Sequence, residues 1–595
     1  MKDPVARADP RVIMRQTGGA APGAGQHRRR QSRQRRATDG AGEDDLDGRA
    51  AADTRTAPGA DERACTDRGL LMTGLVFRGA TLIDGTGSDE RLADVFVAMG
   101  VITAIEEPGR MRGAAGRTID ADGLVLAPGF IDAHTHGDAA PFLPEIDDSK
   151  ISQGVTTEVV GNCGFSLAPC PPSRRADIAE LCGRLFPRLL FDWSSTADLH
   201  AQLDAAGSVT NTVALAGHST LRAAAMGLDD RRAEPAEVDS MRADLRAALA
   251  AGARGLSSGL IYPPGMYSDA DELVELASLL GEEDVYTTHI RNEGRQLHES
   301  VREAITVARR AGCRLQVSHL KAAGQPSWGG VPAALRLMDV ARRSGMTVHH
   351  DVYPYDANST MLASCLPPWF HDGGYAATMA RLHDPLALAR AERELERSDG
   401  TWQNWVAESG WTNVLVASTA AHRHEGLTLD RIAKSSGRSP FEALVEILVA
   451  NDLQATMSVF AMSADDIEAA LTHPFAIVGS DGLPPGTGGK PHPRSYGTFT
   501  RVLGHYVRAT GCLSWPEAVA KMTSRTAAAF ALHDRGVIRV GAAADVILFD
   551  PESIADTATF LDPTSRSVGI ELVAVNGEVS YEQGQTAGVR AGRRL

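Results

Sequence analysis

The chain has 595 residues, too many for one small domain, and its 43% hydrophobic content is ordinary for a globular protein. A formal net charge of −15 argues against a general nucleic-acid binder, and no apolar run approaches the roughly 18 residues that cross a bilayer. We therefore expect neither nucleic acid nor a membrane as a partner. Seven scattered cysteines form no paired framework, which favours a reducing, cytoplasmic setting. The oligomeric state stays open.

Residues 1–72 differ in kind from the rest of the chain. They contain charged clusters such as Arg28-Arg29-Arg30 and Glu43-Asp44-Asp45, with almost no apolar periodicity. A targeting peptide is not favoured, because an apolar core is missing and acidic residues are many. Two interpretations stay open: a disordered extension, or upstream sequence from a misassigned start, since regular patterns begin directly after Met72.

Both ends of the remaining chain are rich in expected strands. The segment 73–127 predicts short strands at 75–78, 81–84, 93–98 and 101–105. The segment 536–595 has similar runs at 541–550 and 570–579, and Asn576-Gly577 is a strong hairpin signal. Two such segments that flank a long centre predict one small β-sandwich domain built from both termini.

The centre of the chain, 128–535, alternates strands with helices such as 233–251 and 297–311. Its apolar strand-like runs are 125–131, 157–160, 212–216, 255–260, 285–288, 314–317, 347–352 and 475–478. Eight such units predict an α/β protein with a (β/α)8 TIM-like barrel, whose chemistry lies at the C-terminal ends of the strands.

One longer insertion interrupts this alternation at about 370–452. It contains a charged helix, 384–397, and a strand-like run, 413–418. We expect it near the C-terminal face of the barrel, where it is a candidate lid or oligomer contact.

Unusual polar residues stand where the predicted strands end. His134 and His136 share one face of a strand end, because residues i and i+2 point the same way. Further ends carry Cys163, His289, His319 and Asp481. In a barrel these ends meet on one axis, although they span most of the chain. Imidazole, thiolate and carboxylate together suit Zn²⁺ best among the common metals.

The motifs at these ends resemble those of the amidohydrolase superfamily and, within it, of the N-acyl-D-amino-acid deacylase (D-aminoacylase) family. The resemblance covers roughly residues 73–590. It is carried by Gly129-Phe-Ile-Asp-Ala-His-Thr-His136, Gly161-Asn-Cys-Gly-Phe165, Gly217-His-Ser-Thr-Leu-Arg222, His289-Ile-Arg291, Ser318-His-Leu-Lys321, Asp351-Val-Tyr-Pro-Tyr355, Ser480-Asp-Gly482 and Lys490-Pro-His-Pro-Arg-Ser-Tyr-Gly497.

The lysines support that branch independently. Many binuclear amidohydrolases bridge their metals with a carbamylated lysine at the end of strand 4, but the region 255–263 contains no lysine. By the family pattern Cys163 takes the bridging role from strand 2. The resemblance implies one tight Zn²⁺ site of Cys163, His289 and His319, with an open fourth position. It also implies a second, weaker site of His134 and His136 with Cys163.

The resemblance further implies hydrolysis of the amide bond of N-acyl-D-amino acids, which releases a carboxylate and a free D-amino acid. Asp481 would accept the proton of the attacking water and pass it to the leaving amine. Lys321, Tyr355 and Arg494 are the matched candidates for binding the free carboxylate of this small-molecule substrate. His349 and His350 are expected to be structural, since neighbours on a strand face opposite ways.

Other functions stay open on the same barrel: a D-specific dipeptidase, a deformylase of substituted amides, or a cyclic amide hydrolase. The last is disfavoured because the strand 4 lysine is missing and the chain has Gly161-Asn-Cys-Gly164 on strand 2 instead. From a different class, a non-catalytic scaffold that lost its metals is disfavoured by the complete set of ligand residues. The preferred side chain and acyl group are not determined, and the preference for the D-enantiomer rests on resemblance alone.

Overall fold

The computed structural model describes residues 74–111, 116–143, 145–183, 185–186, 189–397, 400–483 and 488–595. The expectation for residues 1–72 lies outside these residues. Within them, no helix has the length and apolar character that a bilayer span requires.

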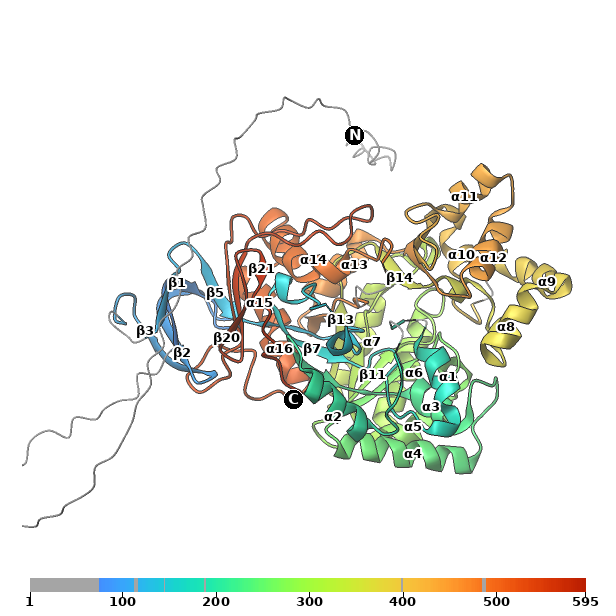
Figure 1. Ribbon diagram of the computed structural model, residues 1–595, viewed down its shortest axis with the longest axis horizontal. Coiled ribbons are helices and arrows are strands. Elements are labelled where there is room, and N and C mark those ends of the chain that lie inside the picture. The colour runs from blue at the N-terminus through green and yellow to red at the C-terminus, as the bar shows by residue number, and fades with distance from the viewer. Residues whose placement is uncertain are drawn as a thin grey trace, which may run out of the picture. The chain divides into compact units, whose positions relative to one another are not determined.

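Eight parallel strand positions form the expected barrel (Figure 1). Seven are single strands, and the third is divided into two short pieces at Leu215. In chain order they are β6 (Phe130–Asp132), β7 (Val155–Val160), β8 (Asn211–Ala214) with β9 (Ala216–Gly217), β10 (Gly255–Gly259), β11 (Val285–His289), β12 (Arg314–Val317), β13 (Val348–Val352) and β17 (Ala476–Val478). The prediction of a TIM-like barrel is confirmed.

The first and last barrel strands close the ring at the end that carries the site. The Ala133 amide donates to the Val478 carbonyl, the His136 amide to the Gly482 carbonyl, and the Asp481 amide to the His134 carbonyl at 2.7 Å. The hydrogen bonds that close the barrel therefore extend beyond both strands. They include His134, His136 and Asp481, which we expected at the site.

Helices cover the outside of the barrel, and several of them turn one apolar side inward. In α6 (Leu297–Ala311) the buried residues Val301, Ala304, Ile305 and Ala308 recur at spacings of three and four, as a half-buried helix requires. The other helices outside the insertion are α1 (Arg175–Cys182), α2 (Thr196–Ala206), α3 (His218–Met226), α4 (Pro235–Ala250), α5 (Ala270–Ala277), α7 (Val331–Arg343), α13 (Ala464–Thr472), α14 (Arg494–Arg501), α15 (Trp515–Met522) and α16 (Ser524–Ala529).

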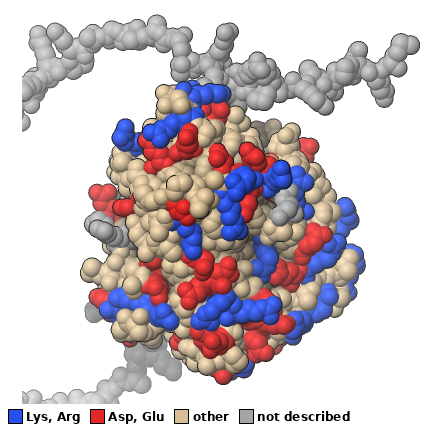
Figure 2. Space-filling view, turned by 90° about the vertical axis from the view of Figure 1, so that its right-hand side faces the viewer, with Lys and Arg blue, Asp and Glu red and all other residues tan. Residues whose placement is uncertain are grey.

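Charged side chains of both signs lie interspersed on the face shown in Figure 2. Some of the exposed charges pair between neighbouring helices. Arg242 of α4 lies 2.8 Å from Glu275 of α5, and Arg310 of α6 lies 2.8 Å from Asp271 of α5. Exposed pairs of this kind contribute little to stability, so we attribute the cohesion of the helix layer to its apolar inner side.

The sandwich domain contains strands from both ends of the described chain, as predicted. Nine strands form one continuous sheet in the order β21-β20-β19-β18-β5-β1-β2-β3, with β4 paired to β1. They are β1 (Gly74–Leu82), β2 (Arg91–Ala98), β3 (Val101–Glu106), β4 (Arg117–Asp120), β5 (Val125–Pro128), β18 (Val546–Phe549), β19 (Ile570–Val575), β20 (Glu578–Glu582) and β21 (Gln585–Thr586). A core that includes Phe77, Val95 and Leu548 lies within it.

The apolar run 125–131, which we expected to be one barrel strand, is divided between the two domains. Its first half is β5, which pairs with β1 and β18 of the sandwich, and its second half is β6 of the barrel. Gly129 lies at the division, and a Cβ there would stand 2.3 Å from the Thr156 side chain. The run is apolar on both sides of this point, and the change of domain that we expected between residues 127 and 128 lies just before it.

The insertion begins and ends further out than the expected bounds of 370 and 452. It contains an antiparallel sheet in the order β14-β16-β15, whose members β14 (Ala357–Met361) and β16 (Ala455–Phe460) lie beyond those bounds. The expected strand 413–418 is β15 (Val414–Thr419), and the expected charged helix is α9 (Pro385–Leu395). The other helices are α8 (Gly374–Leu382), α10 (Trp405–Ser409), α11 (Leu429–Ser436) and α12 (Pro440–Ala450).

We predict that Gly129→Ala destabilises the protein by about 1–3 kcal/mol, because the added methyl group overpacks a buried site against Thr156. The thermal unfolding midpoint measures the effect. Gly281→Ala is the control, since its Cβ would meet only the carboxylate end of Asp284, at 3.3 Å, and its expected change is within about 0.5 kcal/mol. Equal midpoints for the two variants would contradict the close approach at Gly129.

Candidate metal centre

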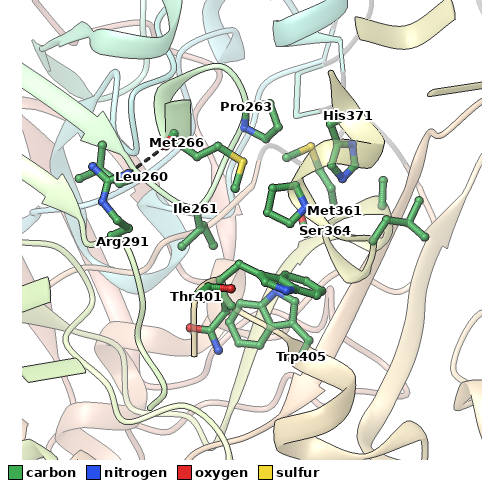
Figure 3. A pocket seen from close by; sticks show the side chains of 15 residues that line it. Leu260, Ile261, Pro263, Met266, Arg291, Met361, Ser364, His371, Thr401 and Trp405 are labelled. Carbon is green, nitrogen blue, oxygen red and sulfur yellow. Dashed lines mark hydrogen bonds between the residues drawn. The ribbon is translucent and has the colours of Figure 1, made fainter. Parts of the chain in front are cut away.

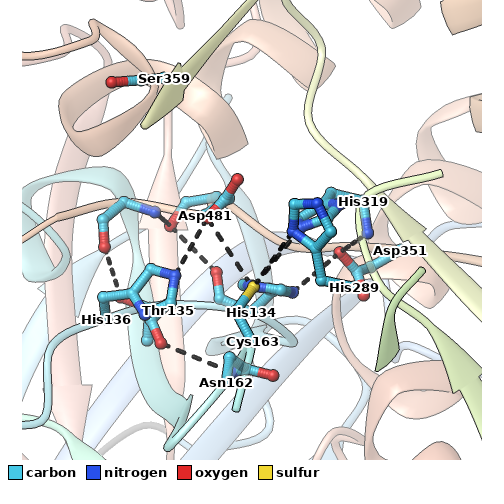
Figure 4. A network of polar contacts seen from close by, with 12 residues as sticks. His134, Thr135, His136, Asn162, Cys163, His289, His319, Asp351, Ser359 and Asp481 are labelled. Carbon is cyan, nitrogen blue, oxygen red and sulfur yellow. Dashed lines mark hydrogen bonds and ion pairs between the residues drawn. The ribbon is translucent and has the colours of Figure 1, made fainter. Parts of the chain in front are cut away.

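Cys163 lies among histidines from three other barrel strands (Figure 4). Its Sγ is 3.2 Å from His134 Nε2, 3.5 Å from His319 Nε2 and 3.7 Å from His289 Nδ1. All four side chains are buried. The barrel thus brings together residues separated by up to 185 positions, because each follows or ends a parallel strand.

Asp481 adds a carboxylate to this cluster. Its Oδ1 lies 3.2 Å from His136 Nε2 and 3.6 Å from His134 Nε2, and its Oδ2 lies 2.9 Å from Arg494 Nη1. His136 therefore joins the group through Asp481. Arg494, which we expected to bind substrate, is buried beside the same carboxylate.

Each of the three histidines around the sulfur has its second ring nitrogen near a carboxylate. His134 Nδ1 is 3.4 Å from Asp351 Oδ1, His289 Nε2 is 3.5 Å from Glu293 Oε2, and His319 Nδ1 is 3.0 Å from Glu293 Oε1. Metal-binding histidines in proteins usually have such carboxylate partners, which orient the ring and fix the nitrogen that faces the ion.

Lys321 lies in this surrounding layer of the site. Its ammonium is 2.6 Å from Glu293 Oε1 and 2.8 Å from His319 Nδ1. Lys321, which we expected to bind a substrate carboxylate, therefore contacts the candidate metal ligand His319.

Three site residues have left-handed backbone conformations that non-glycine residues rarely adopt: Cys163 at φ 53°, His319 at φ 34° and Asp481 at φ 48°. Side-chain hydrogen bonds hold the neighbouring amides. The His319 amide donates to Asp351 Oδ1 at 2.8 Å, and the Gly164 amide donates to Ser257 Oγ at 3.0 Å. Strain of this kind persists where the surroundings fix the conformation, and it concentrates at functional sites.

The charges in the cluster favour a thiolate. Burial opposes ionisation of Cys163, but the positive charges of His134 and His319 outweigh it and hold the pKa of the thiol well below its usual range. Burial likewise opposes protonation of His134, but Cys163 and Asp351 raise the pKa of His134 well above its usual value. A metal ion that binds in place of the histidine protons would therefore meet a thiolate, which is the form of cysteine that binds metals.

The donor set fits a metal ion. Ligand atoms of His134, Cys163, His319 and Asp481 all lie within 4.8 Å of one another, as do those of His289, Glu293 and His319. Thiolate with imidazole is a ligand set typical of Zn²⁺, and catalytic zinc takes three protein ligands with one position open. His134, Cys163, His289 and His319, which we expected to be ligands, belong to these two groups, together with Asp481 and Glu293.

Two tyrosines of the motif 351–355 lie in different surroundings. Tyr355 is outside the cluster: its ring lies 4.9 Å from the Arg501 guanidinium and 5.2 Å from the His492 ring. Tyr353 borders the cluster instead, with its ring 4.6 Å from the Arg494 guanidinium and 5.5 Å from the Lys321 ammonium.

Sequence reasoning missed Tyr353, Glu293 and Asp351 as site residues, although all three stand in or beside the motifs that were recognised at the strand ends. His350, by contrast, faces away from the site and lies 3.0 Å from the Ala470 carbonyl, as a structural residue would.

A pocket lies near the ends of β10 and β11, and none of its lining residues is a donor of the metal centre (Figure 3). Leu260 directly follows β10, Arg291 lies two residues after His289, and the pocket residue Gln403 accepts a hydrogen bond from the Glu293 amide at 2.8 Å. Most lining residues are apolar, and the insertion supplies part of the wall. They include Leu260, Ile261, Met266, Met361, Leu366, Trp402 and Trp405.

A barrel of this type with a thiolate, four imidazoles and a carboxylate at its C-terminal end defines a metal-dependent hydrolase site. The sequence matches the amidohydrolase family over residues 117–344 and 370–581. The chain belongs to that family.

Several relatives refine this assignment. The D-aminoacylase of Alcaligenes xylosoxydans xylosoxydans is 36% identical over 526 residues, which are 88% of this chain and 97% of the relative. The solved N-acyl-D-glutamate deacylase of Bordetella bronchiseptica, complexed with zinc and a phosphonate inhibitor, has a TM-score of 0.75 and 36% identity, covering 88% of this chain and 99% of that one. A solved D-aminoacylase with a binuclear metal centre has a TM-score of 0.72 and 34% identity, with the same coverage.

We predict that Cys163→Ala lowers the zinc content of the purified protein severely, because it removes the one donor that faces three imidazoles. Substitution of a residue that only hydrogen-bonds to a metal ligand typically lowers metal affinity about 10- to 100-fold. Loss of a ligand itself should lower the affinity more. Cys170→Ala is the control, since Cys170 is equally buried and belongs to neither donor group. Elemental analysis measures the zinc content per chain in both variants. A wild-type zinc content in Cys163→Ala would show that Cys163 is not a ligand.

Proposed function

We propose that this protein is a zinc-dependent amide hydrolase that converts N-acyl-D-amino acids to a carboxylate and a free D-amino acid. The observation that carries the proposal is the position of Cys163 between three imidazoles, with the Asp481 carboxylate 3.6 Å from one of them. Relatives named as a D-aminoacylase and an N-acyl-D-glutamate deacylase support the reaction class. Bound zinc would polarise the amide carbonyl and lower the pKa of water to about 7.

Asp481 is the residue that we assign to proton transfer. Burial raises its pKa, but Arg494, His136, His319 and His134 outweigh burial and hold the pKa well below the usual range. The carboxylate is therefore ionised at neutral pH and able to accept a proton. Once Asp481 has taken a proton, it can pass the proton on to the amine, which is a poor leaving group until it is protonated.

Lys321, Arg494 and Tyr353 form the surface that we assign to the substrate carboxylate. The two cations approach the Tyr353 ring at 5.5 Å and 4.6 Å. The Tyr353 hydroxyl is buried and has no hydrogen-bond partner within the described ranges. A carboxylate placed here would meet the Tyr353 hydroxyl as a free donor, beside two cations that it would share with Glu293 and Asp481. Tyr355, 4.9 Å from Arg501 in a neighbouring cluster, would act only indirectly.

The number of metal ions is part of the same proposal. We propose a tight site at Cys163, His289 and His319, and a second, weaker site at His134 and His136. The sulfur faces both groups, since His134 Nε2 is 3.2 Å away and His319 Nε2 is 3.5 Å away. A D-aminoacylase relative is described as activated by one metal and attenuated by a second.

The pocket beside the site favours an apolar substrate side chain. Its walls are mainly Leu260, Ile261, Met266 and Trp405. The one guanidinium in the wall, Arg291, is already engaged by Glu303 at 2.9 Å and by the Met266 carbonyl at 2.9 Å. An acidic side chain would therefore enter a largely apolar space without a free cation to pair with, which is unfavourable.

We predict that Asp481→Asn keeps its zinc but lowers kcat by about 10²–10⁴-fold, because the amide has the carboxylate's shape and cannot accept the proton. Steady-state kinetics and elemental analysis on the same preparation test this. Asp430→Asn, which breaks only an exposed pair with Lys434 on α11, should behave as wild type. Comparable turnover of the two variants would exclude Asp481 from proton transfer.

A substrate panel tests the assigned class. We predict that kcat/KM for N-acetyl-D-leucine exceeds that for N-acetyl-D-glutamate by on the order of 10²-fold, because the glutamate carboxylate would be left unpaired in the pocket. N-acetyl-L-leucine should be a poor substrate, and a preference for it would refute the D-specific assignment.

A positive charge added to the pocket wall should reduce the selectivity for the apolar substrate. Met266→Arg places a cation among the lining residues and should narrow the ratio of leucine to glutamate turnover, because it offers the acidic side chain a partner. Met99→Arg, on a side chain that is 76% exposed in the sandwich domain, is the matched control. An unchanged ratio in Met266→Arg would show that this pocket does not receive the side chain.

A further inference from the structure

Lys150 is a buried cation outside the donor groups of the metal centre. It precedes the short turn η3 (Ile151–Gln153) and is only 4% exposed. Its ammonium lies 2.8 Å from Asp132 Oδ2 and also donates a short hydrogen bond to Ser480 Oγ. Burying a charge is costly unless it is paired, and here both partners lie at the ends of the strands that close the barrel.

The Asp132 carboxylate joins those two strand ends. Its Oδ1 accepts from the Ser480 amide at 2.8 Å and from the His134 amide at 3.2 Å. Its Oδ2 accepts from the Ser480 hydroxyl at 2.5 Å. One carboxylate thus fixes the backbone next to a candidate metal ligand on one strand and next to Asp481 on the other.

Ser480 extends this connection to the far side of Asp481. Its Oγ accepts a hydrogen bond from the Gly482 amide at 3.0 Å. The amides on both sides of Asp481 are therefore tied to the group formed by Lys150, Asp132 and Ser480. A Cβ at Gly482 would stand 2.7 Å from the Lys150 ammonium, so the cation packs directly against the backbone of this turn.

Asp481 needs such support, because its φ of 48° is unfavourable for a residue with a side chain. Strained conformations persist only where the surroundings fix them. We propose that Lys150 is a positioning residue for Asp481: its charge stabilises the Asp132 carboxylate, which with Ser480 holds the Asp481 carboxylate in reach of the substrate. This inference rests on the proposed function.

The consequence is a specific kinetic effect. Without the ammonium, the Asp132 carboxylate would be fully buried with no cation in contact, and the turn that carries Asp481 would relax. The metal ligands Cys163, His289 and His319 lie on other strands and would keep their places. Turnover should therefore fall while zinc and substrate are still bound.

The test compares zinc-loaded Lys150→Met with wild type and with Lys434→Met, an exposed lysine on α11. Lys150→Met should keep its zinc and lower kcat for N-acetyl-D-leucine at least about tenfold, with a much smaller change in KM. Unchanged kcat, or zinc lost in proportion to kcat, would overturn the proposal. Wild type without turnover on any N-acyl-D-amino acid would instead refute the proposed function.

A double variant separates positioning from general packing. In Asp132→Asn the side-chain carbonyl can still accept from both backbone amides, and the neutral amide group needs no cation. Lys150→Met combined with Asp132→Asn should therefore recover part of the kcat lost in Lys150→Met alone, and no recovery would overturn the charge-balancing role.

If Lys150→Met does not fold, Ser480→Ala provides the same test: it should lower kcat with zinc retained, and wild-type kcat would overturn the proposal.

Discussion

The contact of one sulfur atom with three imidazoles is what the rest of the site depends on. Cys163 Sγ lies 3.2–3.7 Å from nitrogens of His134, His289 and His319, in a buried space where an isolated thiolate would be unstable. The imidazoles stabilise the Cys163 thiolate. The thiolate and a metal ion bound to it would in turn stabilise three imidazoles that lie so close together. Because each residue ends or follows a parallel strand, closing the barrel brings the group together.

The surrounding residues hold the donors at these positions against their local preferences. Cys163, His319 and Asp481 all have positive φ, and neighbouring amides are held by Ser257, Asp351 and Asp132. Cys163 and His319 on one side, and the turn that carries Asp481 on the other, are thus held largely by different side chains, although Asp132 also accepts from the His134 amide. In our proposal a change at Lys150 therefore affects Asp481 while Cys163, His289 and His319 keep the metal.

Much of this arrangement follows from the sequence, because strand periodicity locates the barrel strands and polar residues at their ends locate the ligands. The division of the run 125–131 at Gly129 did not follow, since both halves are apolar and only pairing distinguishes them. The sheet of the insertion depends on pairing Ala357 with Phe460, far apart in the chain. The direction of the backbone after β13 decides that Tyr353, and not Tyr355, borders the site. The residue types alone do not specify that direction.

We propose that the Cys163 thiolate holds the catalytic zinc, and zinc K-edge X-ray absorption on the protein with one zinc bound tests this. The spectrum should show one sulfur neighbour at about 2.3 Å together with nitrogen or oxygen neighbours at about 2.0–2.1 Å. A first shell of nitrogen and oxygen alone would contradict it.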